Sequence, residues 1–338
     1  MRLATFLQSA LVAPGSRQPV FRQPMLPALV RLGSTDCGSE SSGDVDNLNG
    51  SSTIMEPNLV AGNRTRYTID DSTCPPVEYD VLKKIVSKHC TSLSAYLSNR
   101  PIAEHTREAF HIAREFVESH PHSKIILDSG CGTGRSTLLL SKMNPDHVVI
   151  GIDRSLARLN RNAVYRTTFQ ERIESDRNND VALSDENVLA ITTPDRPNLL
   201  IIRAELSNFW RCAIDSGWSA LIHKHYLLYP NPYPKNSRLK SRWHAHPSFP
   251  LILQLGGDVV VRSNWEGYLK QFASAVLIAA DEVWSYDDDK NVARKYSASA
   301  LNGPIRLEPN EIPMTNFEKK YFDCGERVYE LFLQQNEH

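Results

Sequence analysis

Short apolar runs alternate with longer amphipathic stretches along the middle of this chain of 338 residues. The apolar runs predict five strands, at residues 125–127, 148–152, 198–202, 219–228 and 258–262. Helical spacing of apolar positions predicts helices between them, at 206–215, 249–255 and 265–278. Because strands and helices alternate, we expect an α/β fold with a doubly wound, mostly parallel sheet and helices on both faces. A last strand at 327–333 is expected at the sheet edge.

The sequence before the first strand divides by composition into two parts. Residues 1–35 combine four arginines with serines and prolines and contain no acid, and residues 36–63 are rich in Ser, Gly, Asn and Asp. This predicts a transit-peptide-like, disordered N-terminus and linker over 1–63. A helical extension follows over 64–123, with two helices after Pro76 separated at 99–101, and the main domain covers 124–338. We expect an organellar protein, with the chloroplast favoured over the mitochondrion; a cytoplasmic protein with an ordinary disordered tail is the alternative.

A glycine-rich stretch joins the first predicted strand to the next helix. Its sequence is DSGCGTG, which places glycines at Gly130, Gly132 and Gly134 directly after Asp128 and Ser129. Glycines at such a turn let the backbone pass close to a ligand. The second strand ends in an acid, Asp153, which suits the hydroxyl groups of a ribose. The pattern predicts a site for a cofactor that carries a nucleoside.

The acid before the first glycine distinguishes between two such cofactors. A dinucleotide site has the spacing G-x-G-x-x-G, and the carboxylate of Asp128 would repel its pyrophosphate. S-adenosylmethionine (SAM) is positively charged and has no phosphate, so we favour SAM over NAD. The third strand is followed by a third acid, Glu205, which fits an acceptor for the adenine amino group.

The loop after the fourth strand reads YPNPYPKNSRLKSRW over residues 229–243. Its three prolines stiffen the backbone that carries Asn231 and Tyr233. Because the carboxyl ends of parallel strands share one crevice, this loop is expected to face the glycine loop. Trp243, His244 and His246 lie just beyond a run of four cations, and this combination favours contacts with RNA phosphates and bases over an ordinary solvated face. The four cations are Lys235, Arg238, Lys240 and Arg242.

Overall composition adds few constraints. The formal net charge is −1, which excludes neither RNA nor a small substrate. Six widely spaced cysteines without a C-x-x-C pair suggest neither a metal site nor a disulfide framework. No apolar run reaches the length of a membrane span. We therefore expect no metal and no membrane association.

Six motifs in the order and spacing of one family extend over about two thirds of the chain. They are DSGCGTG at 128–134, GID at 151–153, RAE at 203–205, YPNPYPKNSRLKSR at 229–242, SNWEGY at 263–268 and TNFE at 315–318. Together they resemble the bacterial-type tRNA (guanine-N7)-methyltransferases, SAM-dependent enzymes with a Rossmann-like fold that modify a guanine in the variable loop of tRNA. The resemblance implies tRNA as the partner, and the transit-like N-terminus favours a type that needs no obligatory protein subunit.

The resemblance also implies roles for individual residues. SAM would contact Asp128, Asp153 and Glu205 together with the glycine loop and Asn231. The substrate would contact Lys235, Asn264 and the segment of Thr315, Asn316, Phe317 and Glu318, with Arg238, Lys240 and Arg242 adding cations. Two departures matter: the family's Pro-Asp-Pro aspartate, proposed to be catalytic, is Asn231 here, and its Thr-Asp-Trp aspartate is Asn264. Tyr233 also replaces a tryptophan.

These departures predict an enzyme with reduced activity. Guanine N7 carries a lone pair, so positioning matters more than a general base. Asn231 keeps an acceptor oxygen but loses the negative charge. A relative that binds tRNA and SAM without turnover is one alternative. An amino-directed (adenine) methyltransferase that uses Asn231, Pro232 and Tyr233 is another, although the Asn-Pro-Pro-aromatic order of that class is not met.

Overall fold

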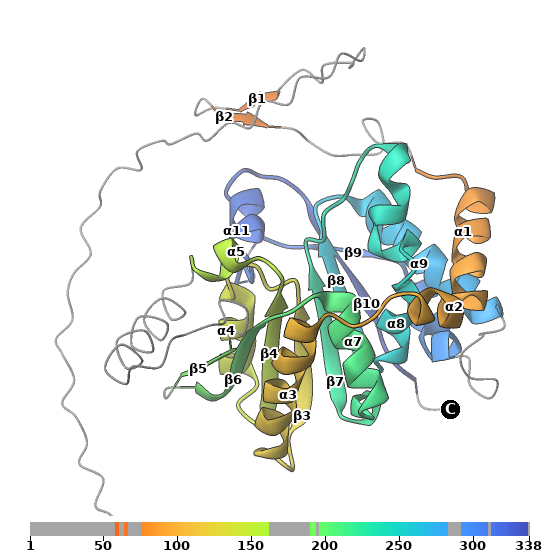
Figure 1. The fold of residues 1–338 in the computed structure, drawn as a ribbon. Helices are drawn as coiled ribbons and strands as arrows, with labels where there is room; N and C mark the ends of the chain where they lie inside the picture. The colour runs from red at the N-terminus through yellow and green to blue at the C-terminus, as the bar shows by residue number, and fades with distance from the viewer. Residues whose placement is uncertain are drawn as a thin grey trace, which may run out of the picture. The chain divides into compact units, whose positions relative to one another are not determined.

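The computed structural model describes residues 58–60, 64–66, 76–161, 190–193, 196–282, 292–309 and 312–336. Within this part, eight strands form one sheet in the order β5-β6-β4-β3-β7-β8-β10-β9 (Figure 1). Five neighbouring strands are parallel: β3 (Lys124–Ser129), β4 (His147–Asp153), β6 (Arg196–Arg203), β7 (Ile222–Leu228) and β8 (Asp258–Ser263). Antiparallel pairings add β5 (Ala190–Thr193), β10 (Val328–Leu333) and β9 (Ile305–Leu307). A separate hairpin consists of β1 (Asn58–Val60) and β2 (Arg64–Arg66).

Helices pack on both faces of the eight-stranded sheet. One face carries α1 (Tyr79–Thr91), α2 (Leu93–Ser98), α3 (Glu104–Glu118), α7 (Leu206–Asp215), α8 (Phe249–Gln254), α9 (Glu266–Asp281) and α10 (Ser297–Leu301). The other carries α4 (Arg135–Met143), α5 (Leu156–Leu159) and the segment that leads into α11 (Asn316–Phe322). Short 3₁₀ turns are η1 (Trp218–Ala220), η2 (Asn236–Ser241), η3 (Trp243–Ala245) and η4 (Val292–Tyr296).

Alternation along the central strands explains the two layers. Successive side chains of a strand point to opposite faces. Ile125 and Leu127 of β3 therefore join the large core under α3, α7 and α9, whereas Ile126 packs with Leu140 of α4. All three isoleucine and leucine side chains of β3 are fully buried. A strand that is apolar on both faces requires helices on both, and the predicted doubly wound fold is confirmed.

The five predicted parallel strands and the three predicted helices between them are all present, with small changes at their ends. Two details were wrong. The last strand, β10, is not at the edge, because β9 pairs with its outer side. Within residues 76–123 the extension holds three helices instead of two, since the chain breaks between α1 and α2 at Ser92 as well as at 99–103.

Several sequence predictions lie outside the described residues. These are the transit-like segment and most of the linker, where only Asn58–Val60 is described. After β4 the chain is described as far as residue 161, which includes α5. No helix in the part that the structure describes combines the length and apolar character needed to cross a membrane.

The helical extension shares its core with the sheet. Leu82, Val86 and Phe110 belong to the same buried cluster as the β3 and β4 side chains. The Phe110 ring packs 4.9 Å from Trp218, measured between ring centroids. The predicted boundary near residue 123 thus marks a change in sequence pattern and not a gap in packing.

A buried polar network joins β3, β7 and α7 beneath the glycine loop. Trp210 Nε1 donates a hydrogen bond to Ser129 Oγ at 3.0 Å, and His225 Nε2 lies 2.8 Å from the same oxygen. Burial lowers the pKa of His225 to about 3, and burial together with nearby Arg242 lowers that of His244 to about 3. Both imidazoles are therefore neutral in the folded protein.

These histidines make stability depend on pH. Below the unfolded pKa of about 6.5, each ring binds a proton in the unfolded chain but not in the folded protein. The contribution of these rings to the free energy of unfolding is therefore full above about pH 6.5 and is lost as pH falls. Each ring should cost about 1.4 kcal/mol per pH unit below that point. Urea denaturation at pH 7.5 and 5.0 measures the loss, and His225→Gln should reduce it.

The difference between variants isolates the histidine contribution. Burial raises the pKa of Asp128 to about 6, so this carboxyl group stabilises the folded protein as pH falls. Because wild type and His225→Gln share that effect, it cancels when their pH slopes are compared. His122→Gln, at an exposed turn, is the matched control and should leave the wild-type pH slope unchanged. A His225→Gln slope equal to wild type would contradict this account.

Candidate active site

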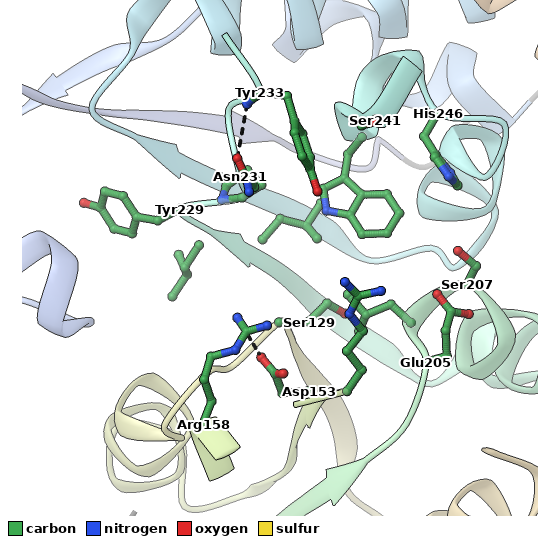
Figure 2. Close-up of a pocket in the computed structure, with 17 residues that line it drawn as sticks. Ser129, Asp153, Arg158, Glu205, Ser207, Tyr229, Asn231, Tyr233, Ser241 and His246 are labelled. Carbon is green, nitrogen blue, oxygen red and sulfur yellow. Dashed lines mark hydrogen bonds and ion pairs between the residues drawn. The ribbon is translucent and has the colours of Figure 1, made fainter. Parts of the chain in front are cut away.

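A pocket of about 350 Å³ lies at the carboxyl ends of the central strands. Ser129 from β3, Asp153 from β4 and the residue after β6, Glu205, line one side. Asn231 and Tyr233, from the loop after β7, line the other, and Figure 2 shows the two groups facing each other across the pocket. Because the chain goes from β3 to β4 in one direction and reaches β7 on the other side, this is the switch point where open α/β sheets bind ligands.

The glycine loop has the geometry that the sequence predicts. Gly130, Gly132 and Gly134 have φ angles of 82°, 61° and 76°, a region that favours glycine. A Cβ at Gly130 or Gly132 would meet no other part of the protein within 4 Å, so both face open space. Of the three glycines, Gly130 lines the pocket. Gly151 of the GID motif serves packing instead, because a Cβ there would lie 2.4 Å from Thr137 Oγ1.

Asp128 lies beneath the loop and does not line the pocket. It is 1% exposed, and its Oδ2 accepts hydrogen bonds from Ser136 Oγ at 2.6 Å and Thr137 Oγ1 at 2.7 Å. Burial raises its pKa to about 6, and the two hydroxyl groups oppose that shift. In this arrangement Asp128 fixes the first turn of α4 against β3, and its effect on a bound cofactor passes through the loop.

Asp153 connects the two cofactor motifs. Its Oδ2 accepts from the backbone N–H of Gly132 at 3.0 Å, and its Oδ1 accepts from that of Ser155 at 2.7 Å. Arg158 Nη1 lies 3.4 Å from Oδ2 and is half-exposed. A ribose that binds Asp153 would compete with this guanidinium, which can turn toward solvent. The sequence analysis did not predict Arg158 as a site residue, although its position five residues after Asp153 could have indicated it.

Glu205 is held from two directions. Its Oε2 accepts from Asn208 N at 2.8 Å and so caps helix α7. Its own backbone N–H donates to Thr106 Oγ1 of α3 at 3.2 Å. The carboxylate expected to meet the adenine is therefore positioned by the sheet, by α7 and by the helical extension.

The loop after β7 has an unusual backbone. Tyr229 and Tyr233 have φ angles of 52° and 43°, and they are the positive-φ residues other than glycine among the described residues. Such residues are uncommon and cluster at functional sites. Asn231 lies between them, and its Oδ1 accepts a hydrogen bond from Tyr233 N at 3.2 Å, closing a local turn. The loop thus presents Asn231 and Tyr233 in one defined arrangement.

Arg242 holds this loop from below, which corrects its predicted role as an RNA contact. The side chain is fully buried. Its Nε and Nη2 donate to the Tyr233 carbonyl at 3.2 and 3.1 Å, and Nη1 donates to Gln271 Oε1 at 2.9 Å. The guanidinium also lies 4.9 Å from the Trp265 ring centroid. No phosphate can reach Arg242 in this arrangement, because the loop covers it.

The other three predicted cations remain at the surface. Lys235, Arg238 and Lys240 are exposed beside the pocket loop. The guanidinium of Arg238 lies 5.2 Å above the Tyr233 ring. An exposed cation on an aromatic ring is suited to contact a nucleic acid.

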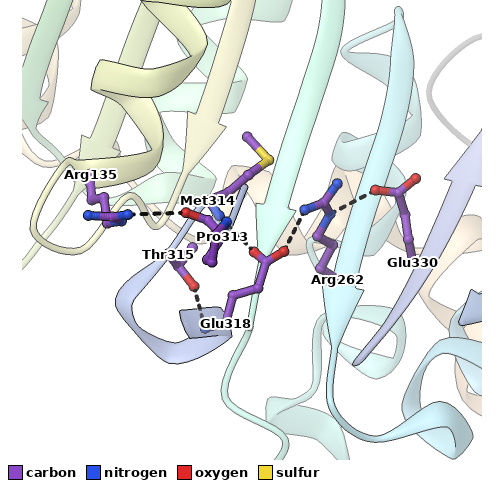
Figure 3. Close-up of polar contacts among 7 residues, drawn as sticks. All are labelled: Arg135, Arg262, Pro313, Met314, Thr315, Glu318 and Glu330. Carbon is purple, nitrogen blue, oxygen red and sulfur yellow. Dashed lines mark hydrogen bonds and ion pairs between the residues drawn. The ribbon is translucent and has the colours of Figure 1, made fainter. Parts of the chain in front are cut away.

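The TNFE segment has mainly structural contacts for two of its four residues (Figure 3). Thr315 Oγ1 caps α11 by accepting from Glu318 N at 3.0 Å, and Glu318 Oε2 accepts from Met314 N at 3.1 Å. Glu318 is fully buried and pairs at 2.7 Å with Arg262, which also pairs at 2.7 Å with Glu330. The predicted substrate contact of Glu318 is therefore not possible by direct approach. Asn316 and Phe317 are exposed.

The structure does not bring every predicted residue to the pocket. Asn264 follows β8, is half-buried and does not line the pocket, and neither do Lys235 or the 315–318 segment. Trp243 and His246, expected near RNA, do line it. Among the residues that the structure describes, no group of three or more His, Cys, Asp or Glu side chains is placed to hold a metal ion.

The donor set fits SAM. Open space above two left-handed glycines admits a ligand close to the backbone. Asp153 and Glu205 add carboxylates that follow two neighbouring strands, β4 and β6. Bound there, SAM would supply a methyl group activated by its positively charged sulfur. Asp153, Glu205 and the loop from Gly130 to Gly134 would hold it.

Comparison with known sequences agrees with this fit. A family model described as "Putative methyltransferase" matches residues 122–331, more than half of the chain. A tRNA (guanine-N(7)-)-methyltransferase of Acinetobacter baylyi is 21% identical over 221 residues, covering 64% of this chain and 72% of that protein. One of Mycolicibacterium gilvum is 26% identical over 207 residues, covering 55% of this chain and 66% of that protein. A solved structure described as an antibiotic-related methyltransferase is 11% identical with a TM-score of 0.40, covering 65% of this chain and 93% of that one.

The matched residues contain the glycine loop, the three strand-end acids and the loop after β7. The pocket that these elements form is suited to SAM, as the family requires. The chain therefore belongs to the tRNA (guanine-N7)-methyltransferase family of SAM-dependent methyltransferases.

Proposed function

We propose that this protein transfers the methyl group of SAM to N7 of a guanine in the variable loop of tRNA. The observation that supports this best is the loop after β7. It places Asn231 and Tyr233 on the pocket and Lys235, Arg238 and Lys240 on the adjoining surface. One rigid segment thus connects the cofactor pocket to a cationic surface suited to RNA phosphates.

The reaction requires positioning more than proton transfer. Guanine N7 has a free lone pair at neutral pH, so no side chain has to remove a proton before transfer. Holding two reactants in line can supply ~7–11 kcal/mol of the barrier reduction. The strained Tyr229–Tyr233 segment, held by Arg242, is the part of this chain that would orient the guanine.

Asn231 leads us to propose a slowed enzyme. A carboxylate in its place would offset the positive charge that develops on the guanine, and losing one preorganised electrostatic contact typically costs ~100–1,000-fold. Asn264 lacks the family's second carboxylate in the same way. A relative that binds SAM and tRNA without turnover is the alternative outcome of the same substitutions. The amino-directed alternative is disfavoured, because the order Asn231, Pro232, Tyr233 does not match the Asn-Pro-Pro-aromatic loop of that class.

We extend the proposal to location and partners. The arginine-rich first 35 residues support an organellar protein, in a chloroplast or a mitochondrion, that acts without an obligatory protein subunit. Import of the segment 1–63 fused to a fluorescent reporter would test the location.

The first prediction concerns the product. Full-length protein incubated with unmodified tRNA and methyl-labelled SAM should place label in 7-methylguanosine. Asn231→Asp and Asn264→Asp together should raise turnover at least about tenfold, because the first restores negative charge at the pocket and the second restores the family's other carboxylate. Nucleoside analysis by chromatography and mass spectrometry gives both results. Label in an adenine would overturn the assignment, and bound SAM and tRNA without transfer in either protein would indicate a binding relative.

The second prediction concerns the cationic surface. Replacing Lys235 and Arg238 by glutamine should make the plot of log binding constant against log salt concentration shallower by about 2 in slope. Filter binding of tRNA measures it. Glutamine at Lys124 and Lys142 is the matched control, because both are exposed and lie away from the pocket, at the amino end of β3 and near the end of α4. Equal slopes for the two double variants would exclude phosphate contacts by the loop.

The third prediction separates Arg242 from these cations. Arg242→Gln should lower the maximal methylation rate about 100-fold, because the loop loses its support and small displacements of reacting groups are costly. The salt slope of tRNA binding should stay at the wild-type value, since the guanidinium is buried. Arg242→Lys, which keeps the charge without the planar fork, should also be slow. A shallower salt slope with a normal rate would show that Arg242 meets phosphate instead.

A further inference from the structure

A run of aromatic rings follows one wall of the pocket. It starts in the helical extension, where the rings of Tyr96 and His246 meet edge to face with 6.5 Å between centroids. His246 meets Trp243 at 5.4 Å, Trp243 meets Trp210 at 4.9 Å, and Trp210 meets His225 at 5.6 Å. The Trp210 indole then donates to Ser129, at the start of the glycine loop. The run connects α2 to the cofactor loop.

Trp243 and His246 are the members of this run that line the pocket. Both are half-buried, whereas Trp210 and His225 are fully buried behind them. The Trp243 backbone N–H donates to Tyr268 Oη at 3.3 Å, and the preceding residue is the clamped Arg242. The indole is therefore supported by Trp210 at its back and fixed at its backbone.

The surroundings of this wall suit a purine. Leu206 and Ser207 line the pocket next to Glu205, the acid expected to accept from the adenine amino group. Figure 2 shows Glu205, Ser207 and His246 together at one end of the pocket, away from Tyr229. Burial lowers the pKa of His246 to about 4, so its ring is neutral and adds no charge beside an uncharged base. Asp153, expected at the ribose, lies nearer the middle.

We propose that Trp243 is a cofactor-binding residue whose ring receives the adenine of SAM, with the edge of His246 closing this subsite. Tyr96 of the helical extension is a positioning residue that acts through His246. The proposal rests on SAM as the cofactor and not on which RNA base is methylated. It replaces the expectation that Trp243 stacks on an RNA base. The rings that remain available to stack on RNA bases are those of Tyr233, with the Arg238 guanidinium above it, and of exposed Phe317.

Binding of S-adenosylhomocysteine and of tRNA, measured separately on the full chain, tests the proposal. Removing a stacked ring typically weakens binding by ~1–3 kcal/mol, so Trp243→Leu should raise the Kd for S-adenosylhomocysteine at least about fivefold. Trp243→Phe keeps a ring and should restore most of the affinity. The Kd for tRNA should stay at the wild-type value in both variants. Tyr79→Leu, which removes an exposed ring at the start of α1, is the matched control and should change neither constant.

A second measurement covers the case in which Trp243→Leu does not fold. Adenine stacked on an indole quenches its emission, so S-adenosylhomocysteine should quench the wild-type tryptophan fluorescence, and Trp243→Phe should lose most of that quenching. Absence of quenching in the wild type would overturn the proposal. An unchanged Kd for S-adenosylhomocysteine with a raised Kd for tRNA would overturn it as well, and would assign the ring to RNA. Neither result depends on methyl transfer, so failure of the proposed reaction would be seen separately.

Discussion

The buried guanidinium of Arg242 is the interaction on which the site depends. A buried charge is costly unless its donors are satisfied, and here they meet the Tyr233 carbonyl, Gln271 and the Trp265 ring. These partners come from the loop after β7, from α9 and from the residue after Asn264. One side chain thereby fixes the relative position of two segments that carry family motifs. Arg242 also fixes the backbone next to Trp243, which lines the same pocket.

The clamp explains how the loop keeps an unfavourable backbone. Tyr229 and Tyr233 lie in a left-handed region that costs of order 1–3 kcal/mol for each residue. Such strain persists only where the surroundings over-determine it, and the prolines, the Asn231 turn and Arg242 do so here. The result is a segment that can present an amide and a ring without rearranging. For a reaction that needs alignment more than acid–base chemistry, that rigidity is the useful property.

Motif residues divide into those that touch ligands and those that build the frame. Glu318 and Thr315 cap α11, and the Arg262 pair ties that helix to β8. Burial raises the pKa of Glu318, while the adjacent guanidinium opposes the shift. Asp128 similarly braces α4. Residues that a family keeps can thus act on substrate by holding Phe317 or the glycine loop in place, which a motif pattern cannot distinguish from contact.

The sequence by itself determined the order of strands and helices, the glycine loop and the acids at the strand ends, because these follow from local periodicity and backbone chemistry. Only the tertiary structure decided which cations are surface groups. Arg238 and Arg242 lie in one basic run, yet one is exposed and the other fully buried. It also moved Trp243 from the RNA side to the cofactor pocket, and placed β9 outside β10. Burial depends on which distant elements pack over a side chain, and the residues next to it in the sequence do not determine that packing.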